Sequence, residues 1–308
     1  MTSWFKYLLY ASVAFLAIAL YKTDYITVPQ IQSPAALAGS FAFLIFGFLC
    51  DPVSWRLLLA KSGYPVPHRE CFAAAGIYVF TKYIPGKIWT IVGRSGFVAD
   101  RHSYPMSAIT SMTLLWQLIC VWLGVIFGAI GLTLLGKILV WGWPILILWL
   151  VLTIVVFSDA AQTLARRVYK RMFRREITIP SLSVRSTVLS LPWFVVMWLC
   201  LSIAFHLLVV ALSPNPVPLG VGFGFPLTIT IGVFAAFAPG GIGVREGVMV
   251  GYLALAGIPP QAAAAISIAA RIWFILGELF MFVVGLAAGA WVKRTAARRE
   301  KASHGRLP

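Results

Sequence analysis

Long apolar runs dominate the pattern of this chain, and polar positions gather in short stretches between them. A helix of about 20 apolar residues is long enough to cross the hydrocarbon core of a bilayer. We therefore predict six spanning helices, and their bounds are 4–21, 35–60, 107–135, 138–157, 189–212 and 261–292. Within the second run, Asp51-Pro52 predicts an interruption, because proline removes a helical hydrogen bond.

Composition supports a bilayer as the solvent of this chain. Hydrophobic residues make up 60% of it and charged residues only 11%, whereas soluble domains carry about 25% charged residues. We predict an all-α polytopic membrane protein with one integral domain over residues 1–292. That domain has a first half at 1–157, a basic linker at 158–186 and a second half at 187–292. A basic tail is expected at 293–308.

The net charge of +16 is concentrated beside apolar segments. Of the 25 Lys and Arg residues, seven lie in 166–185 and six in 293–306. Cytoplasmic loops carry an excess of such residues, so the linker, the tail and both termini are predicted to be cytoplasmic. The loops 61–70 and 94–105 are placed on the same side, and 22–34, 136–137 and 213–220 on the other. This arrangement favours topology signals over a nucleic-acid-binding patch, and no nucleic-acid partner is predicted.

Two apolar segments do not fit simple crossings. Residues 71–93 begin and end on the cytoplasmic side, and residues 221–256 must enter and leave on the opposite side. We interpret both as re-entrant hairpins, whose irregular backbone is tolerated only where protein or water covers it. Hairpins that enter from opposite faces are typical of an inverted repeat with a binding site near mid-membrane.

Each hairpin contains a proline–glycine break. The residues are Pro85 and Gly86 in the first, and Pro239, Gly240, Gly241 and Gly243 in the second. Proline and glycine disfavour helix interiors, and a helix that restarts after them directs free N–H groups forward, which favours an anion. A simple kink is the alternative interpretation.

Charged residues in apolar segments are costly and indicate a functional site by default. Nine occur here: Asp51, Arg56, Lys82, Lys87, Arg94, Arg245, Glu246, Arg271 and Glu278. Six are cations and three are anions, so a lipid phosphate is the expected additional anion.

The candidate headgroup ligands are Arg245, Arg271, Arg94 and Lys87, with Glu246 and Glu278 as supporting carboxylates. Arg271 and Glu278 are seven residues apart and share a helix face. Internal ion pairs and snorkelling at helix ends are the alternatives, chiefly for Arg56, Lys82 and Arg94 near the predicted interfaces.

Motifs for soluble catalysis are missing from the sequence. Its four cysteines have no CxxC spacing, and no Walker, GxSxG or HExxH pattern occurs, so no cofactor or metal is predicted. An ATPase activity within this chain is excluded. A proton-coupled step through Glu246, Glu278 or Asp51 remains open.

The run from Ala238 to Gly247, APGGIGVREG, continues through Gly257-Ile258 to Arg271 and resembles a signature of the lysylphosphatidylglycerol synthase transmembrane-domain family. The run from Lys82 to Trp89, followed by Gly93-Arg94, is similar to its first signature. The resemblance covers roughly residues 5–292 and implies a lipid-translocating bundle with two re-entrant hairpins. Because the soluble aminoacyl-transferase domain of fused members is missing from this sequence, we expect no synthesis of lysyl-lipid.

The leading hypothesis is a bacterial inner-membrane lipid flippase or transporter that is not an enzyme. Stand-alone relatives are linked to aminoacyl-phospholipids, polyprenyl-linked sugars and hopanoids, so the lipid stays open. The alternative is a membrane scaffold or accessory subunit for a cytoplasmic glycosyl- or aminoacyl-transferase. An intramembrane transferase that uses Glu246 or Glu278 as a base is a weaker third hypothesis, and a homodimer is compatible with each.

Overall fold

The computed structural model describes residues 30–83, 89–158, 184–234 and 243–304. The described residues are helical and contain no strand. Five of the helices are long and apolar enough to cross a membrane, which confirms five of the six predicted spans. They are α2 (Pro34–Lys61), α5 (Met106–Leu134), α6 (Ile138–Phe157), α8 (Val184–Leu212) and α11 (Pro260–His304). The predicted first helix, 4–21, lies outside the described residues.

The two segments predicted to be hairpins form short helices. The first contains α3 (His68–Ile77), η1 (Val79–Tyr83) and α4 (Trp89–His102), and the second contains η2 (Leu219–Phe223), α9 (Gly224–Phe234) and α10 (Val244–Leu255). The longest of these has 14 residues, or about 21 Å at the α-helical rise, which is less than the roughly 30 Å of hydrocarbon in a bilayer. None of these helices alone is long enough to span.

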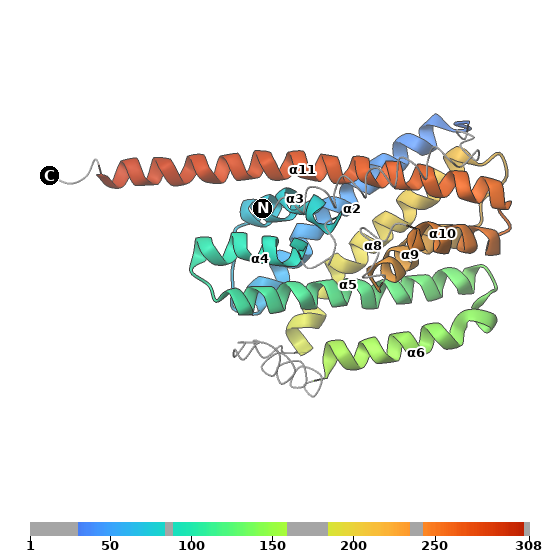
Figure 1. Ribbon diagram of the computed structural model, residues 1–308, viewed down its shortest axis with the longest axis horizontal. Coiled ribbons are helices and arrows are strands. Elements are labelled where there is room, and N and C mark those ends of the chain that lie inside the picture. Colours follow the sequence, from blue (N-terminus) through green and yellow to red (C-terminus); the bar gives the residue numbers. More distant parts are fainter. Residues whose placement is uncertain (1–29, 84–88, 159–183, 235–242, 305–308) are drawn as a thin grey trace.

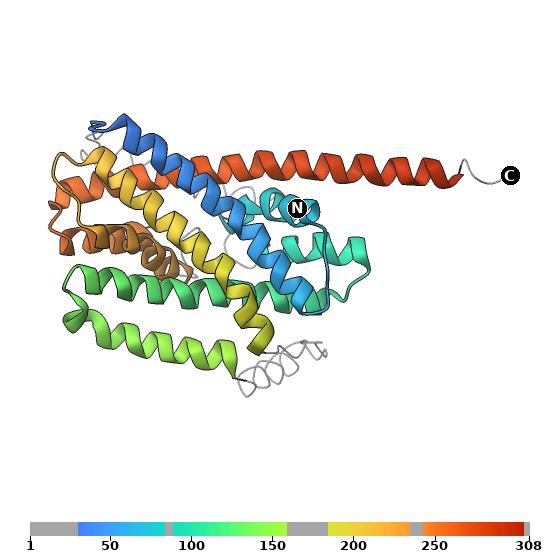
Figure 2. The ribbon, with the colours of Figure 1, turned by 180° about the vertical axis from the view of Figure 1, so that it is seen from behind.

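Helices α5, α6 and α11 lie along the long axis of the bundle, and α2 and α8 pack side by side and cross it obliquely (Figures 1 and 2). Helices α3 and α4 lie toward one end of this axis, and α9 and α10 toward the other (Figure 1). The C-terminal part of α11 extends from the end that holds α4. The α5–α6 turn lies at the opposite end (Figure 1).

Three predicted boundaries are wrong. Helix α2 continues through Asp51-Pro52 without interruption, because Pro52 and the neighbouring Ser54 and Trp55 are buried against other helices that hold the backbone. The predicted loop 94–105 is mostly helix α4.

Helix α4 forms because Arg94, Ser95, Val98 and Ala99 make one buried face at helical spacing. The last helix extends past its predicted end at residue 292, since α11 runs without a break to His304. The segment 296–302, AARREKA, consists of strong helix formers, and this explains the continuation.

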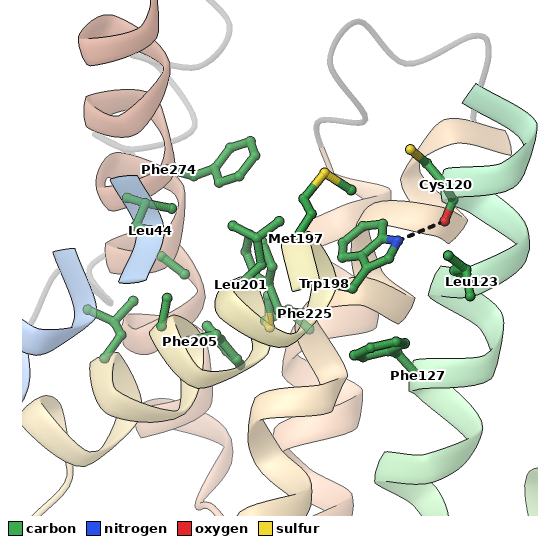
Figure 3. Packing of buried hydrophobic residues seen from close by; sticks show 14 of the residues in the cluster. Leu44, Cys120, Leu123, Phe127, Met197, Trp198, Leu201, Phe205, Phe225 and Phe274 are labelled. Carbon is green, nitrogen blue, oxygen red and sulfur yellow. Dashed lines mark hydrogen bonds between the residues drawn. The ribbon is translucent and has the colours of Figure 1, made fainter. Parts of the chain in front are cut away.

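The main apolar core joins α2, α5, α8, α9 and α11. Phe205 and Phe225 are fully buried in it, and Trp198 anchors α8 to α5 by donating its indole N–H to the Cys120 carbonyl at 3.0 Å (Figure 3). Phe274 of α11 lies at the edge of this core, and its ring centroid is 5.3 Å from that of Phe225. The core therefore fixes the face of α11 that carries the charged residues described next.

Candidate functional site

The start of α10 is tied to α11 through one carboxylate. Gly243 precedes α10 with φ of +85°, a left-handed conformation that glycine adopts without strain. Its N–H donates to Glu246 Oε2 at 2.6 Å, and the other oxygen of Glu246 accepts from Arg271 Nη1 at 3.2 Å. Glu246 therefore caps the helix and holds an arginine of α11 with the same side chain. Its supporting role at a headgroup site stays a prediction.

Arg245 is buried but has no carboxylate partner among the described residues. Its guanidinium lies over the ring of Phe274 at 4.8 Å and over that of Phe225 at 5.5 Å. Aromatic faces attract cations, but they do not accept the five N–H bonds that a guanidinium offers. A buried arginine with this environment is suited to a ligand that brings acceptor oxygens.

Glu278 is fully buried and is held from η1. Lys82 Nζ lies 2.5 Å from Glu278 Oε1, and the Tyr83 hydroxyl donates to Oε2 at 2.7 Å. Lys82 and Tyr83 are the last described residues before 84–88, which contains the first Pro-Gly break. The buried carboxylate on α11 thus anchors the segment that leads into this break.

One face of α11 joins these groups. Arg271, Phe274 and Glu278 follow one another at spacings of three and four residues, as the sequence predicts for Arg271 and Glu278. Arg271 lies over the ring of Tyr83 at 5.5 Å, and Lys82 lies over the ring of Phe274 at 5.1 Å. The six polar residues in this region are called the polar cluster below. They are Lys82, Tyr83, Arg245, Glu246, Arg271 and Glu278.

The polar cluster carries more positive than negative charge. It contains three cations, Lys82, Arg245 and Arg271, against two carboxylates. The adjoining segments 84–88 and 235–242 contain no Asp or Glu in the sequence, so they supply no carboxylate that neutralises Arg245. Charge buried away from water needs a compensating partner. An anion is the ligand that this balance favours.

A small cavity lies within the polar cluster, beside its excess positive charge. A cavity of about 10 Å³ lies between α10 and α11, and it is lined by Arg245, Glu246, Met249, Ser267, Ala270 and Arg271. This volume corresponds to roughly one water molecule. A ligand larger than water would fit there only if α10 and α11 moved apart.

Arg94 lies in a different environment. Its Nη2 is 2.9 Å from Asp51 Oδ2, and its guanidinium stacks over Trp55 at 4.2 Å and Trp116 at 4.6 Å. These contacts join α4 to α2 and α5. The structure gives Arg94 an internal ion pair and no contact with the polar cluster, in line with the alternative considered for it from sequence.

The other predicted site residues lie outside the described part of the chain: Pro85, Gly86, Lys87, Pro239, Gly240 and Gly241. Their predicted roles stay predictions. Lys82 is among the nine charges counted from sequence but was not placed in the site, and Tyr83 carries no sequence signal beyond its position beside the first break. No group of three or more potential metal ligands occurs among the described residues.

An all-helical bundle with five spanning-length helices and buried charge at its broken segments defines a multi-pass membrane protein. The family model described as the lysylphosphatidylglycerol synthase TM region matches residues 3–285, and the chain belongs to this family. The match confirms the resemblance that both signatures indicate. No curated protein matched the chain.

Proposed function

We propose that this protein is a bacterial inner-membrane lipid flippase or transporter. It moves a phospholipid or a polyprenyl-linked lipid with an anionic phosphate headgroup between the leaflets. The observation that carries this proposal is Arg245, a buried cation that lies over two phenylalanine rings and forms no ion pair with a carboxylate of the described residues. Membership in a family of membrane domains from lipid-related proteins supports it.

The chemistry of a phosphate group fits the polar cluster. A phosphodiester carries one negative charge, and arginine binds phosphate through paired N–H donors. The Arg245 guanidinium forms no ion pair with a described carboxylate, and Arg271 lines the same small cavity. Binding a phosphate there neutralises the excess charge of the cluster. The carboxylates Glu246 and Glu278 hold the neighbouring cations in place.

The arrangement of the short helices supports a route from both sides. Helices α3 and α4 lie toward one end of the bundle and α9 and α10 toward the other (Figure 1). Tyr83 of the polar cluster directly precedes residues 84–88, and Arg245 lies three residues after residues 235–242. We propose that residues 71–93 and 221–256 are two re-entrant hairpins that bring the headgroup to the polar cluster from opposite leaflets, with both termini in the cytoplasm.

Replacing Arg245 with methionine is expected to reduce lipid transport by roughly 10- to 100-fold, the range that a lost charge-assisted hydrogen bond implies. The measurement is transfer of a fluorescent anionic lipid between leaflets of reconstituted vesicles. Because Arg245 forms no ion pair with a described carboxylate, its replacement breaks none, and the melting temperature should stay the same or rise. Arg245→Lys should retain part of the rate, since it keeps the charge but not the paired donors.

The matched control is Arg101→Met. Arg101 is an exposed cation near the end of α4 that lies over Phe97, so this variant should transport at the normal rate. Normal transport by Arg245→Met would contradict the proposal. So would a strong loss of thermal stability in that variant, because it would show that the buried cation is part of the fold. If a cytoplasmic transferase co-purifies with the protein and keeps full activity when lipid transport is abolished, that result would favour the membrane-scaffold hypothesis instead.

A further inference from the structure

An open apolar groove of about 650 Å³ runs between α5 and α6, outside the polar cluster. Its walls are aliphatic and aromatic side chains, with Thr133 as the one hydroxyl. On α5 its lining runs from Val125 to Leu134, and on α6 from Ile138 to Trp149. The volume is within the range of protein sites that bind small ligands, about 300–1,000 Å³. The chemistry of the lining requires an apolar occupant.

The length and position of the groove match one leaflet of a bilayer. At 1.5 Å per residue its walls extend about 14 Å along α5 and about 17 Å along α6. One leaflet contributes roughly 15 Å of hydrocarbon. The groove therefore begins at the α5–α6 turn and ends near the depth of the bilayer centre. A lipid in the leaflet at the α5–α6 turn has an acyl chain that begins at the same depth as the groove, runs in the same direction and has about the same length.

The groove faces outward from the bundle. Of the five spanning-length helices, α6 is the least packed, with only 6% of its apolar window buried. Its outer positions are large and apolar, for example Leu139 and Ile147. Lipid hydrocarbon is the solvent of such a surface, so an acyl chain reaches the groove directly from the bilayer.

A cation lies at the end of the groove next to the α5–α6 turn. Lys137 is exposed at the N-cap of α6, directly between the groove residues Leu134 and Ile138, and it has no ion pair within the described ranges. Trp141 and Trp143 are exposed one turn further on, as expected at the depth of the lipid headgroups. Positive charge at this depth attracts anionic lipid.

We propose that the α5–α6 groove is a binding site for an anionic phospholipid, with one acyl chain in the groove and the phosphate at Lys137. The site is separate from the polar cluster and does not depend on the transport function. It holds a resident lipid in the leaflet at the α5–α6 turn.

The test places a bimane label at Ile130→Cys, halfway along the groove, in liposomes that contain brominated lipids. The four native cysteines are buried, which favours selective labelling. Bromine on the acyl chains quenches the label on contact. Brominated phosphatidylglycerol should bind about fivefold more tightly than brominated phosphatidylcholine, the effect of one lysine near the surface. Lys137→Gln should make the two lipids equal, and Lys293→Gln, an exposed cation on α11, should not.

A second experiment fills the groove with a larger side chain. Gly142 lines it, and a Cβ there would meet only Ile138 side-chain atoms, at 3.5 Å or more, so Gly142→Phe should fill the groove and reduce quenching by both lipids. The matched control is Ile147→Phe, which enlarges an exposed residue of α6 outside the lining and should leave quenching unchanged.

Three results would overturn the proposal. Equal quenching by the two lipids in the parent protein would show ordinary boundary lipid without a headgroup site. A label shielded from both lipids, with shielding lost as the protein is diluted in the membrane, would show that a second copy covers the groove. Shielding at every dilution would show that another part of this chain covers the groove. The readout is lipid binding, so each of these results leaves the transport proposal standing.

Discussion

Replacing Asp51 with alanine is expected to lower the free energy of unfolding by about 3 kcal/mol. The change leaves Arg94 with no countercharge at a position where its side chain is only 5% exposed. Breaking a buried ion pair by removing one partner costs about 3–5 kcal/mol, and the lower value applies because the Asp51 side chain is 21% exposed. The two tryptophan faces beside Arg94 remain, but they do not neutralise its charge. Unfolding in mixed micelles, followed by helical circular dichroism, measures the change.

The double variant Asp51→Ala with Arg94→Met should recover most of the lost stability, because an apolar side chain in this place carries no charge to compensate. Asp100→Ala is the control, since Asp100 is exposed on α4 and has no ion pair among the described residues. Unchanged stability in Asp51→Ala, or no recovery in the double variant, would contradict a structural role for the pair. Arg94 would then return to the candidate headgroup ligands.

Much of the helical layout follows from sequence because lipid imposes a simple rule. An apolar run of spanning length must satisfy its backbone internally, so five long runs predict five helices correctly. Arg271 and Glu278 also follow from sequence, since a spacing of seven residues within a continuous helix places them on one face. Arg245 and Glu246 are predicted as neighbours of a glycine-rich break, and their adjacency to Arg271 needed only that α10 and α11 pack together.

The choice of ion-pair partners does not follow from sequence. Arg94 pairs with Asp51, 43 residues away, and Tyr83 binds Glu278, 195 residues away. A count of charges establishes that an excess of cations exists, but not which cation is left over. That depends on how the short helices turn against α2 and α11. The interruption predicted at Pro52 failed for a related reason, because buried neighbours on other helices override a local preference.

The close contact between α3 and α11 places Lys82 and Tyr83, and it depends on two glycines. A Cβ added to Gly285 would lie 2.6 Å from the Gly76 Cα and 2.7 Å from the Ile77 nitrogen. These are backbone atoms, so no side-chain rotation relieves the clash. Glycine at both positions lets the helices approach in the way that small residues permit in membranes. Helix α3 leads directly into η1, so a shift of α3 moves the partners of Glu278.

Gly285→Ala is therefore expected to lower the free energy of unfolding by about 1–3 kcal/mol, the usual range for overpacking, and to slow lipid transport as well. Gly251→Ala on α10 is the matched control. No atom lies within 4 Å of its added Cβ, so this variant should equal or slightly exceed the parent in stability, as alanine does in helices. Thermal unfolding and the vesicle transport rate measure both variants.

The double variant Gly76→Ala with Gly285→Ala separates this contact from two independent defects. A single displacement of α3 makes room for both methyl groups, so the double variant should lose less stability than the two single losses combined. Full additivity would mean that each methyl group is accommodated separately. Normal stability and transport in both single variants would show that α3 lies farther from α11 than this packing requires. In that case only the contacts of Lys82 and Tyr83 with Glu278 would hold η1 in place.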